Sequence, residues 1–168
     1  MSIGIFYGSN GGATESIAEQ IRNAMDLEAD LHDIADVNVD TFNEYSHIII
    51  GTSTWGDGEL QDDWDDKFSD FEGVDFSGKT VAFFGLGDQE GYDENFLDGM
   101  GTLHNAAVKN GANVVGNGWS TDGYEYEESI AVQDGAFVGL AIDEDNQDDL
   151  TEERVQKWTE IIKPSFQD

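Results

Sequence analysis

A segment near the amino terminus, rich in glycine and hydroxyl residues, has the composition of an anion-binding loop. It follows a short apolar run that stops at Gly8, and it consists of Ser9, Asn10, Gly11, Gly12, Ala13 and Thr14. Small residues in such a loop let backbone N–H groups point at a ligand, and a helix that begins there adds partial positive charge. The segment therefore predicts a site for an anion such as phosphate.

The same segment lacks the cation that a triphosphate site requires. Nucleotide triphosphatases place a lysine after the last glycine of G-x-x-x-x-G-K-[ST], whereas Ala13 stands in that position here and the first basic residue is Arg22. The dinucleotide pattern G-x-G-x-x-G is also absent from this segment. We therefore expect one terminal phosphate held by amides and by the hydroxyls of Ser9 and Thr14. The alternative is a tight strand-to-helix turn that binds nothing.

Two later loops are expected to face the same site. Residues 53–58 and 86–93 each follow a buried apolar run and are rich in glycine and polar residues. The first loop carries Trp55 and the second carries Tyr92. An indole and a phenol beside a phosphate cradle indicate a flat conjugated ring held between them. The alternative for each aromatic residue is packing back onto the core.

The elements that must position these loops alternate between strand and helix. The first predicted strand begins at Ile3, and further strands are predicted at 29–34, 47–52, 80–85 and 113–115. The strand at 113–115 is expected to resume at 136–142 after an interruption. The first predicted helix begins at Thr14, and further helices are predicted at 62–71, 95–109 and 151–163. Thr151 is expected to cap the last helix, and Lys163 and Pro164 are expected to end it. Such alternation predicts an α/β fold with a parallel sheet covered on both faces and a ligand beyond the carboxyl ends of its strands.

Composition narrows the possible functions further. The 168 residues suit one domain over 1–168, and 37 acidic against seven basic residues give a formal charge of −30. This charge excludes nucleic acid and anionic membrane surfaces as partners, and it indicates either solubility in salt or attraction toward basic proteins. No cysteine is present for a disulfide or thiolate site, and the histidines do not have metal-ligand spacing. No apolar stretch has membrane-spanning length and no secretory signal is evident, so a cytoplasmic protein is expected.

Four segments resemble the long-chain flavodoxins. They are GTSTWGDGELQDDW at 51–64, GLGDQEGYDEN at 85–95, STDGY at 120–124 and VGLAIDEDN at 138–146. The resemblance covers nearly the whole chain and implies a monomer with a doubly wound, five-stranded parallel sheet in the order 2-1-3-4-5. It also implies that the interruption at about 120–135 is the loop that separates long-chain from short-chain members.

The resemblance implies a function and a cofactor as well. The protein would hold one noncovalent FMN and act as a low-potential one-electron carrier that shuttles between semiquinone and hydroquinone, rather than as a catalyst. Its partners would be basic redox proteins such as ferredoxin–NADP reductase or other ferredoxin-dependent oxidoreductases. Electron-rich rings and nearby carboxylates would disfavour a negatively charged reduced flavin. The alternatives are an FMN-dependent NAD(P)H:quinone reductase and, if no flavin binds, a nonredox acidic binding module.

The FMN contacts implied by the resemblance come from all three loops. Residues 9–14 and Thr54 would hold the phosphate, while Trp55 and Tyr92 would cover the two faces of the isoalloxazine. The remaining contacts would be Gly56, Asp57 and Gly58 beside flavin N5, Leu86, Gly87 and Asp88 at the pyrimidine edge, Asn95 on the third loop and Asp145 near the ribityl chain. Gly11 departs from the threonine that is common in the family, which removes one hydroxyl from the phosphate site.

Overall fold

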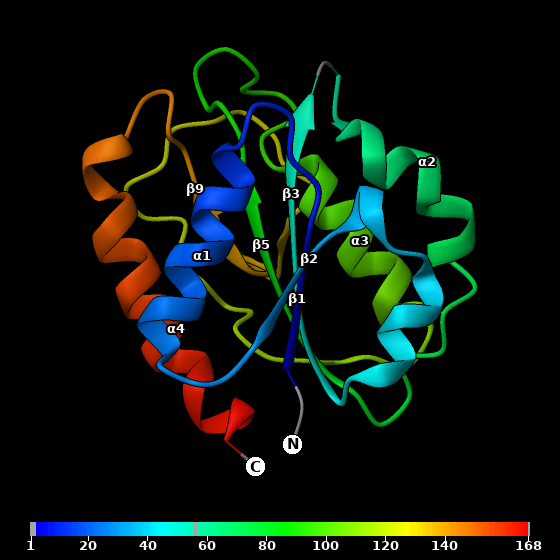
Figure 1. Ribbon diagram of the computed structural model, residues 1–168. Coiled ribbons are helices and arrows are strands. Elements are labelled where there is room, and N and C mark those ends of the chain that lie inside the picture. Colours follow the sequence, from blue (N-terminus) through cyan, green and yellow to red (C-terminus); the bar gives the residue numbers. More distant parts are fainter. Residues whose placement is uncertain (1–2, 56, 168) are drawn as a thin grey trace.

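The computed structural model describes residues 3–55 and 57–167, and its centre is a mostly parallel sheet (Figure 1). The parallel strands are β1 (Ile3–Tyr7), β2 (Asp30–Asp33), β3 (His47–Trp55), β5 (Thr80–Leu86), β6 (Asn113–Val114) and β9 (Leu140–Ile142). Three shorter strands pair antiparallel: β4 (Glu59–Leu60) with the end of β3, and β7 (Val132–Gln133) with β8 (Ala136–Phe137). The chain thus combines a parallel sheet with two local hairpins.

The strand order is β2-β1-β3-β5-β6, with β9 also beside β5. β6 pairs with Thr80 and Val81 at the start of β5, whereas β9 pairs with Phe84, Gly85 and Leu86 at its end. The two short strands therefore share the fifth position of the sheet. This arrangement confirms the predicted order 2-1-3-4-5 and the predicted interruption of the last strand.

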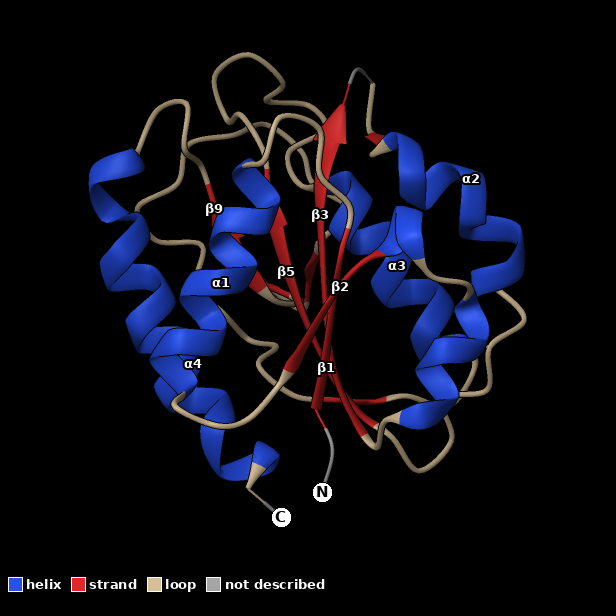
Figure 2. Cartoon of the chain, in the orientation of Figure 1, coloured by secondary structure: helices blue, strands red, loops and turns tan. Residues whose placement is uncertain are grey.

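Helices cover both faces of the sheet (Figure 2). α1 (Ala13–Met25) and α4 (Thr151–Phe166) lie on one face, and α2 (Asp62–Phe71) and α3 (Asp98–Lys109) lie on the other. Short 3₁₀ helices complete the connections at Ile34–Asp36, Val39–Glu44 and Asp148–Leu150. Among residues 3–55 and 57–167, no helix has the length and hydrophobicity to cross a membrane.

The two-residue period of the strands divides the core into two layers. In β1, Ile5 packs with Ile17 and Trp158 under α1 and α4, whereas the adjacent Phe6 packs with Trp64 and Phe71 under α2. All six residues are fully buried. Because successive strand side chains point to opposite faces, an apolar run without alternation predicts a strand buried on both sides. The strand predictions at 47–52 and 80–85 are confirmed for the same reason.

Two strand boundaries differ from the sequence prediction. Residues 53–55, predicted as loop, continue β3, because Thr54 pairs with Leu60 and Trp55 pairs with Glu59. In the last part of the fifth strand only 140–142 pair with β5, since 136–137 turn back to pair with β7. In both places a hairpin supplies the backbone partner, and a pattern of side chains along one segment does not reveal such pairing.

Two helix boundaries also differ. α3 begins at Asp98 rather than Asn95, because Leu97 has a left-handed φ of 61° and the Asn95 amide donates to Asp98 Oδ2 at 3.0 Å. Thr151 is the first residue of α4 and does not cap it; its hydroxyl donates to Glu144 Oε2 at 2.8 Å. α4 also continues through Pro164 to Phe166, which is fully buried. Packing of this last turn outweighs the hydrogen bond that proline cannot donate.

His104 provides a pH-dependent contribution to stability. It lies buried in α3 beside the ring of Phe83, and burial lowers the pKa of its imidazole below the usual 6.5. Because the unfolded chain takes up this proton at a higher pH than the folded chain does, acidification from about pH 7.5 to about pH 5.5 favours unfolding. Urea unfolding should therefore show a smaller loss of stability over this range in His104→Gln than in the parent protein. Parallel pH profiles for the two proteins would contradict this expectation.

Candidate functional site

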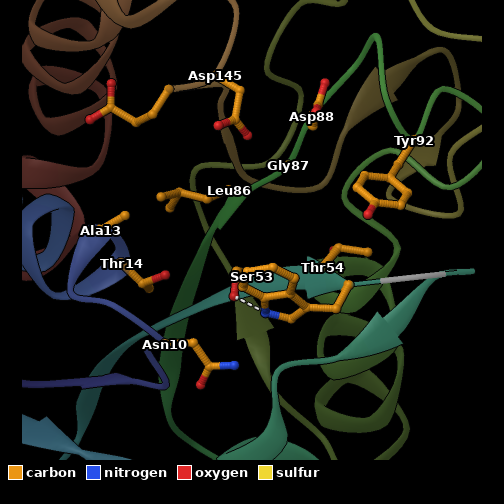
Figure 3. A pocket seen from close by; sticks show the side chains of 12 residues that line it. Asn10, Ala13, Thr14, Ser53, Thr54, Leu86, Gly87, Asp88, Tyr92 and Asp145 are labelled. Carbon is orange, nitrogen blue, oxygen red and sulfur yellow. Dashed lines mark hydrogen bonds between the residues drawn. The ribbon is translucent and has the colours of Figure 1, made fainter.

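One cleft lies at the carboxyl ends of the parallel strands, where the strand order reverses between β1 and β3 (Figure 3). Its lining residues come from four segments that are far apart in the sequence. They are Asn10, Ala13 and Thr14 after β1, Ser53, Thr54 and Trp55 in β3, Leu86, Gly87, Asp88 and Tyr92 after β5, and Glu144 and Asp145 after β9. The three predicted loops therefore meet at one site, which Figure 3 shows between Thr14 on one side and Tyr92 on the other.

The segment between β1 and α1 places backbone donors at the wall of this cleft. Gly11 and Gly12 have φ angles of 85° and 92°, in the left-handed region that glycine adopts without strain. The Gly12 N–H donates to Ser9 Oγ at 3.1 Å, which closes the loop on itself. In the part of the chain that the structure describes, no side chain caps the first turn of α1, which begins with Ala13 and Thr14 at the cleft wall. The first N–H groups of a helix have no intrahelical acceptor, so these donors can bind an anion.

The two aromatic side chains predicted to face the site do so. Trp55 and Tyr92 line the same cleft and have 42% and 43% of their surface exposed. The Trp55 indole N–H donates to Ser53 Oγ at 2.9 Å, the bond drawn dashed in Figure 3, and this contact fixes the ring on the end of β3. The Tyr92 N–H donates to the Asp88 carbonyl at 2.9 Å. Each ring therefore stays exposed because hydrogen bonds hold the segment that carries it. Large apolar rings that are exposed together in one cleft are typical of a ligand site.

Thr54 lines the cleft but uses its side chain elsewhere. It is buried, and its hydroxyl oxygen accepts the N–H of Gly99 at 2.8 Å. This bond ties the end of β3 to the first turn of α3. A Cβ at Gly99 would lie 3.0 Å from Thr54 Oγ1 and from the Ser53 carbonyl oxygen, so the close approach of the two elements favours glycine. The hydroxyl of Thr54 therefore positions the strand that carries Trp55.

A buried carboxylate joins the third loop to the segment after β9. Asp143 has no exposed surface, and its Oδ2 accepts from Gln89 N at 3.1 Å, Gln89 Nε2 at 2.7 Å and Asn146 Nδ2 at 2.9 Å. Its Oδ1 accepts from Asp145 N at 3.1 Å and Asn146 N at 3.0 Å. The Asn146 amide also donates to Asp88 Oδ1 at 2.8 Å. Asp143 thus fixes both segments that carry carboxylates at the cleft, although sequence patterns do not single it out.

The cleft has a strongly negative rim. Asp88 accepts hydrogen bonds from Gly91 N, the Asn146 amide and Glu90 N, of which the first contributes most, so the pKa of this carboxyl is lowered and it stays ionised. The pKa of Asp145 is raised, first by desolvation and then by the charges of Asp88 and Asp143. The same field that disfavours the charge on Asp145 acts on any further negative charge in the cleft.

The structure sorts the predicted site residues into two groups. Ten of the predicted residues line the cleft: Asn10, Ala13, Thr14, Thr54, Trp55, Leu86, Gly87, Asp88, Tyr92 and Asp145. Six others do not line it: Ser9, Gly11, Gly12, Asp57, Gly58 and Asn95. Gly56 lies outside the described residues. Ser53 and Glu144 line the cleft without having been predicted, and their positions beside Thr54 and Asp145 are the only sequence signal for them.

The fold and the cleft together define a class: doubly wound α/β proteins that bind a ligand beyond the carboxyl edge of a parallel sheet. Comparison with known proteins narrows this class to a family. The sequence model of the flavodoxin family matches residues 5–158, so the chain belongs to the flavodoxins.

Individual relatives agree with this assignment. A flavodoxin from Nostoc is 48% identical over 165 residues, which cover 98% of this chain and 96% of the relative. One from Synechocystis is 50% identical over 167 residues, or 98% of each chain. Among solved structures, Fusobacterium nucleatum flavodoxin bound to flavin mononucleotide superimposes with a TM-score of 0.93 at 35% identity, over 98% of both chains. The likeness extends across nearly the whole length of each relative.

Proposed function

We propose that this protein binds one FMN noncovalently in the cleft and carries single electrons between redox proteins in the cytoplasm. The observation that supports this proposal most directly is the convergence of the uncapped start of α1, Trp55 and Tyr92 on one cleft. Bound FMN supplies the redox chemistry, because its ring system accepts and returns electrons one at a time. The chain supplies binding, shielding and electrostatic tuning.

The residues at the start of α1 suit a terminal phosphate. Ala13 and Thr14 line the cleft, and their N–H groups lie in the uncapped first turn, where the helix dipole is positive. No side chain fills the space beside Gly11 or Gly12, since a Cβ at either position would have no neighbour within 4 Å. None of the described residues that line the cleft is basic, so amide and hydroxyl groups are the donors that this part of the chain offers the phosphate.

The aromatic pair suits the isoalloxazine ring. Trp55 and Tyr92 extend from different loops and leave a large part of each ring exposed to the cleft. A planar ligand between them would cover both rings and exclude water from its own two faces. Such covering places the ligand in a medium of lower dielectric constant, where the nearby carboxylates act more strongly.

The negative rim would make the carrier strongly reducing. Two like charges about 8 Å apart repel by about 2 kcal/mol at the effective dielectric constant of about 20 near a protein surface. Asp88, Glu144 and Asp145 all line the cleft, so each disfavours the addition of negative charge to its occupant. The last electron taken up would therefore be held weakly and given up readily.

The acidic surface also indicates the kind of protein that exchanges electrons with this one. The partners are redox proteins, and we propose basic ones such as a ferredoxin–NADP reductase, because the chain carries a formal charge of −30. The rate of association should fall at least about tenfold between about 0.02 M and 0.5 M salt, since salt screens the attraction. Stopped-flow measurement of electron transfer at several salt concentrations tests this. A rate that does not change with salt would rule out charge-driven docking.

Titration of the flavin-free protein with FMN tests the proposal as a whole. We expect saturation at one FMN per chain, with quenching of flavin fluorescence as the ring stacks on Trp55 and Tyr92. Riboflavin, which lacks the phosphate, should bind more weakly because it leaves the start of α1 without its anion. Absence of binding would favour a nonredox acidic module. A quinone reductase, which the family assignment does not favour, would be recognised by steady NAD(P)H oxidation with a quinone.

A further inference from the structure

Arg154 is a buried cation without an anionic partner among residues 3–55 and 57–167. The residue is 8% exposed, and its Cζ lies 4.1 Å from the centre of the Tyr124 ring. Its Nη1 is covered and has no hydrogen-bond partner in the part of the chain that the structure describes. A guanidinium carries five N–H donors, and within residues 3–55 and 57–167 no acceptor or carboxylate engages those of Arg154.

This arrangement is unusual in a chain with 37 acidic side chains. A buried charge normally has an ion-pair or hydrogen-bond partner, because desolvation without compensation is costly. The carboxylate next to Arg154 in the sequence, Glu153, instead pairs with Lys157 at 3.1 Å on the exposed side of α4. Stacking on Tyr124 favours the cation but satisfies none of its N–H groups.

Arg154 lines a cleft between the start of α4 and the segment at 119–124. Trp119, Ser120, Tyr124, Arg154 and Lys157 contribute to its lining. Trp119 Nε1 donates to the Tyr124 hydroxyl at 2.9 Å, and that hydroxyl donates to the Ala141 carbonyl at 2.6 Å. The platform under Arg154 is therefore fixed to β9. This cleft shares no lining residue with the cleft between β1 and β3.

We propose that this second cleft binds a small oxyanion, a carboxylate or a phosphate, through the guanidinium of Arg154. A planar guanidinium held on an aromatic ring can present the paired N–H groups of Nε and Nη2 at the spacing of two oxygens of such an anion, while Nη1 stays covered. Lys157, at the same cleft, adds a second positive charge. Asp122 and Glu153 also line the cleft and oppose the anion, so we expect dissociation constants in the millimolar range.

The experiment uses the FMN-loaded protein, so that added phosphate cannot enter the site at α1. The chain has two arginines, Arg22 and Arg154, and their side-chain Nε–Hε signals can be followed by ¹⁵N NMR. Acetate and phosphate are titrated separately at constant ionic strength, with chloride as the reference salt. We expect the Arg154 signal and the Trp119 indole signal to shift and saturate, whereas Arg22 serves as the internal control and does not saturate.

Two variants distinguish the paired hydrogen bonds of the guanidinium from the effect of its positive charge alone. Arg154→Lys keeps the cation and should weaken binding about tenfold, because a single ammonium replaces the fork. Lys157→Gln should weaken it only about threefold, since this residue contributes charge alone. Saturation with acetate only, with phosphate only or with both identifies the ligand chemistry and supports the proposal. Shifts that do not saturate, or that are equal for Arg22 and in chloride, would overturn it. These readouts do not involve electron transfer, so the outcome is independent of the redox function.

Discussion

Replacing Trp55 with alanine is expected to weaken FMN binding by about 3 kcal/mol, which raises the dissociation constant on the order of a hundredfold. The indole is 42% exposed at the cleft and is held there by its bond to Ser53. Its removal takes away one wall of the proposed ring site and leaves the start of α1 unchanged. Fluorescence titration with FMN measures the change.

The stability of the flavin-free protein distinguishes a binding role from a structural one. Because Trp55 lies at the surface end of β3, the alanine variant should unfold in urea within about 1 kcal/mol of the parent protein. Trp55→Phe keeps an aromatic wall and should lose about tenfold or less in affinity. Ile161→Ala, at an exposed position of α4, is the matched control and should leave FMN binding unchanged. Unaltered affinity in Trp55→Ala would show that the ring does not contact the cofactor.

Replacing Asp143 with alanine is expected to lower the free energy of unfolding by about 3 kcal/mol. This carboxylate accepts five hydrogen bonds from Gln89, Asp145 and Asn146, and its loss leaves buried donors without an acceptor. It also releases the loop of Tyr92, so FMN affinity should fall at least about tenfold although Asp143 does not line the cleft. Urea unfolding and FMN titration on the same preparation measure both effects.

Matched substitutions define how Asp143 acts. Asp143→Asn keeps one acceptor oxygen and should lose about half as much stability as the alanine variant. Asp149→Ala removes an exposed carboxylate nearby in the sequence and should change stability by no more than about 0.5 kcal/mol. If Asp143→Ala were as stable as Asp149→Ala, the network at the third loop would contribute nothing to the fold.

The fold could be predicted where local pattern alone decides the structure. The apolar run that begins at His47 predicts a buried strand, and the stripe of Ile17, Ile21 and Met25 predicts a helix packed against a sheet. The structure confirms both elements. Trp55 and Tyr92 could be placed at one site because loops after parallel strands meet at one edge. The family resemblance added the strand order, which no local pattern contains.

The remaining features depend on contacts between distant segments. β3 extends to Trp55 because Glu59 and Leu60 return to pair with it, and α4 runs past Pro164 because Phe166 is buried. Asp143 and Arg154 are single polar residues whose importance comes from burial. Nothing in their sequence neighbourhoods distinguishes them from the many exposed charges around them.

Anaerobic reductive titration of the FMN-loaded protein with reference dyes tests whether the negative rim of the cleft makes the bound flavin strongly reducing. We expect two separate one-electron steps, the second at a potential well below that of free FMN, because Asp88, Glu144 and Asp145 disfavour added negative charge. Asp145→Asn should shift the second potential upward. Reduction in a single two-electron step at the potential of free FMN, unaffected by Asp145→Asn, would show that the carboxylates of the rim do not control the flavin.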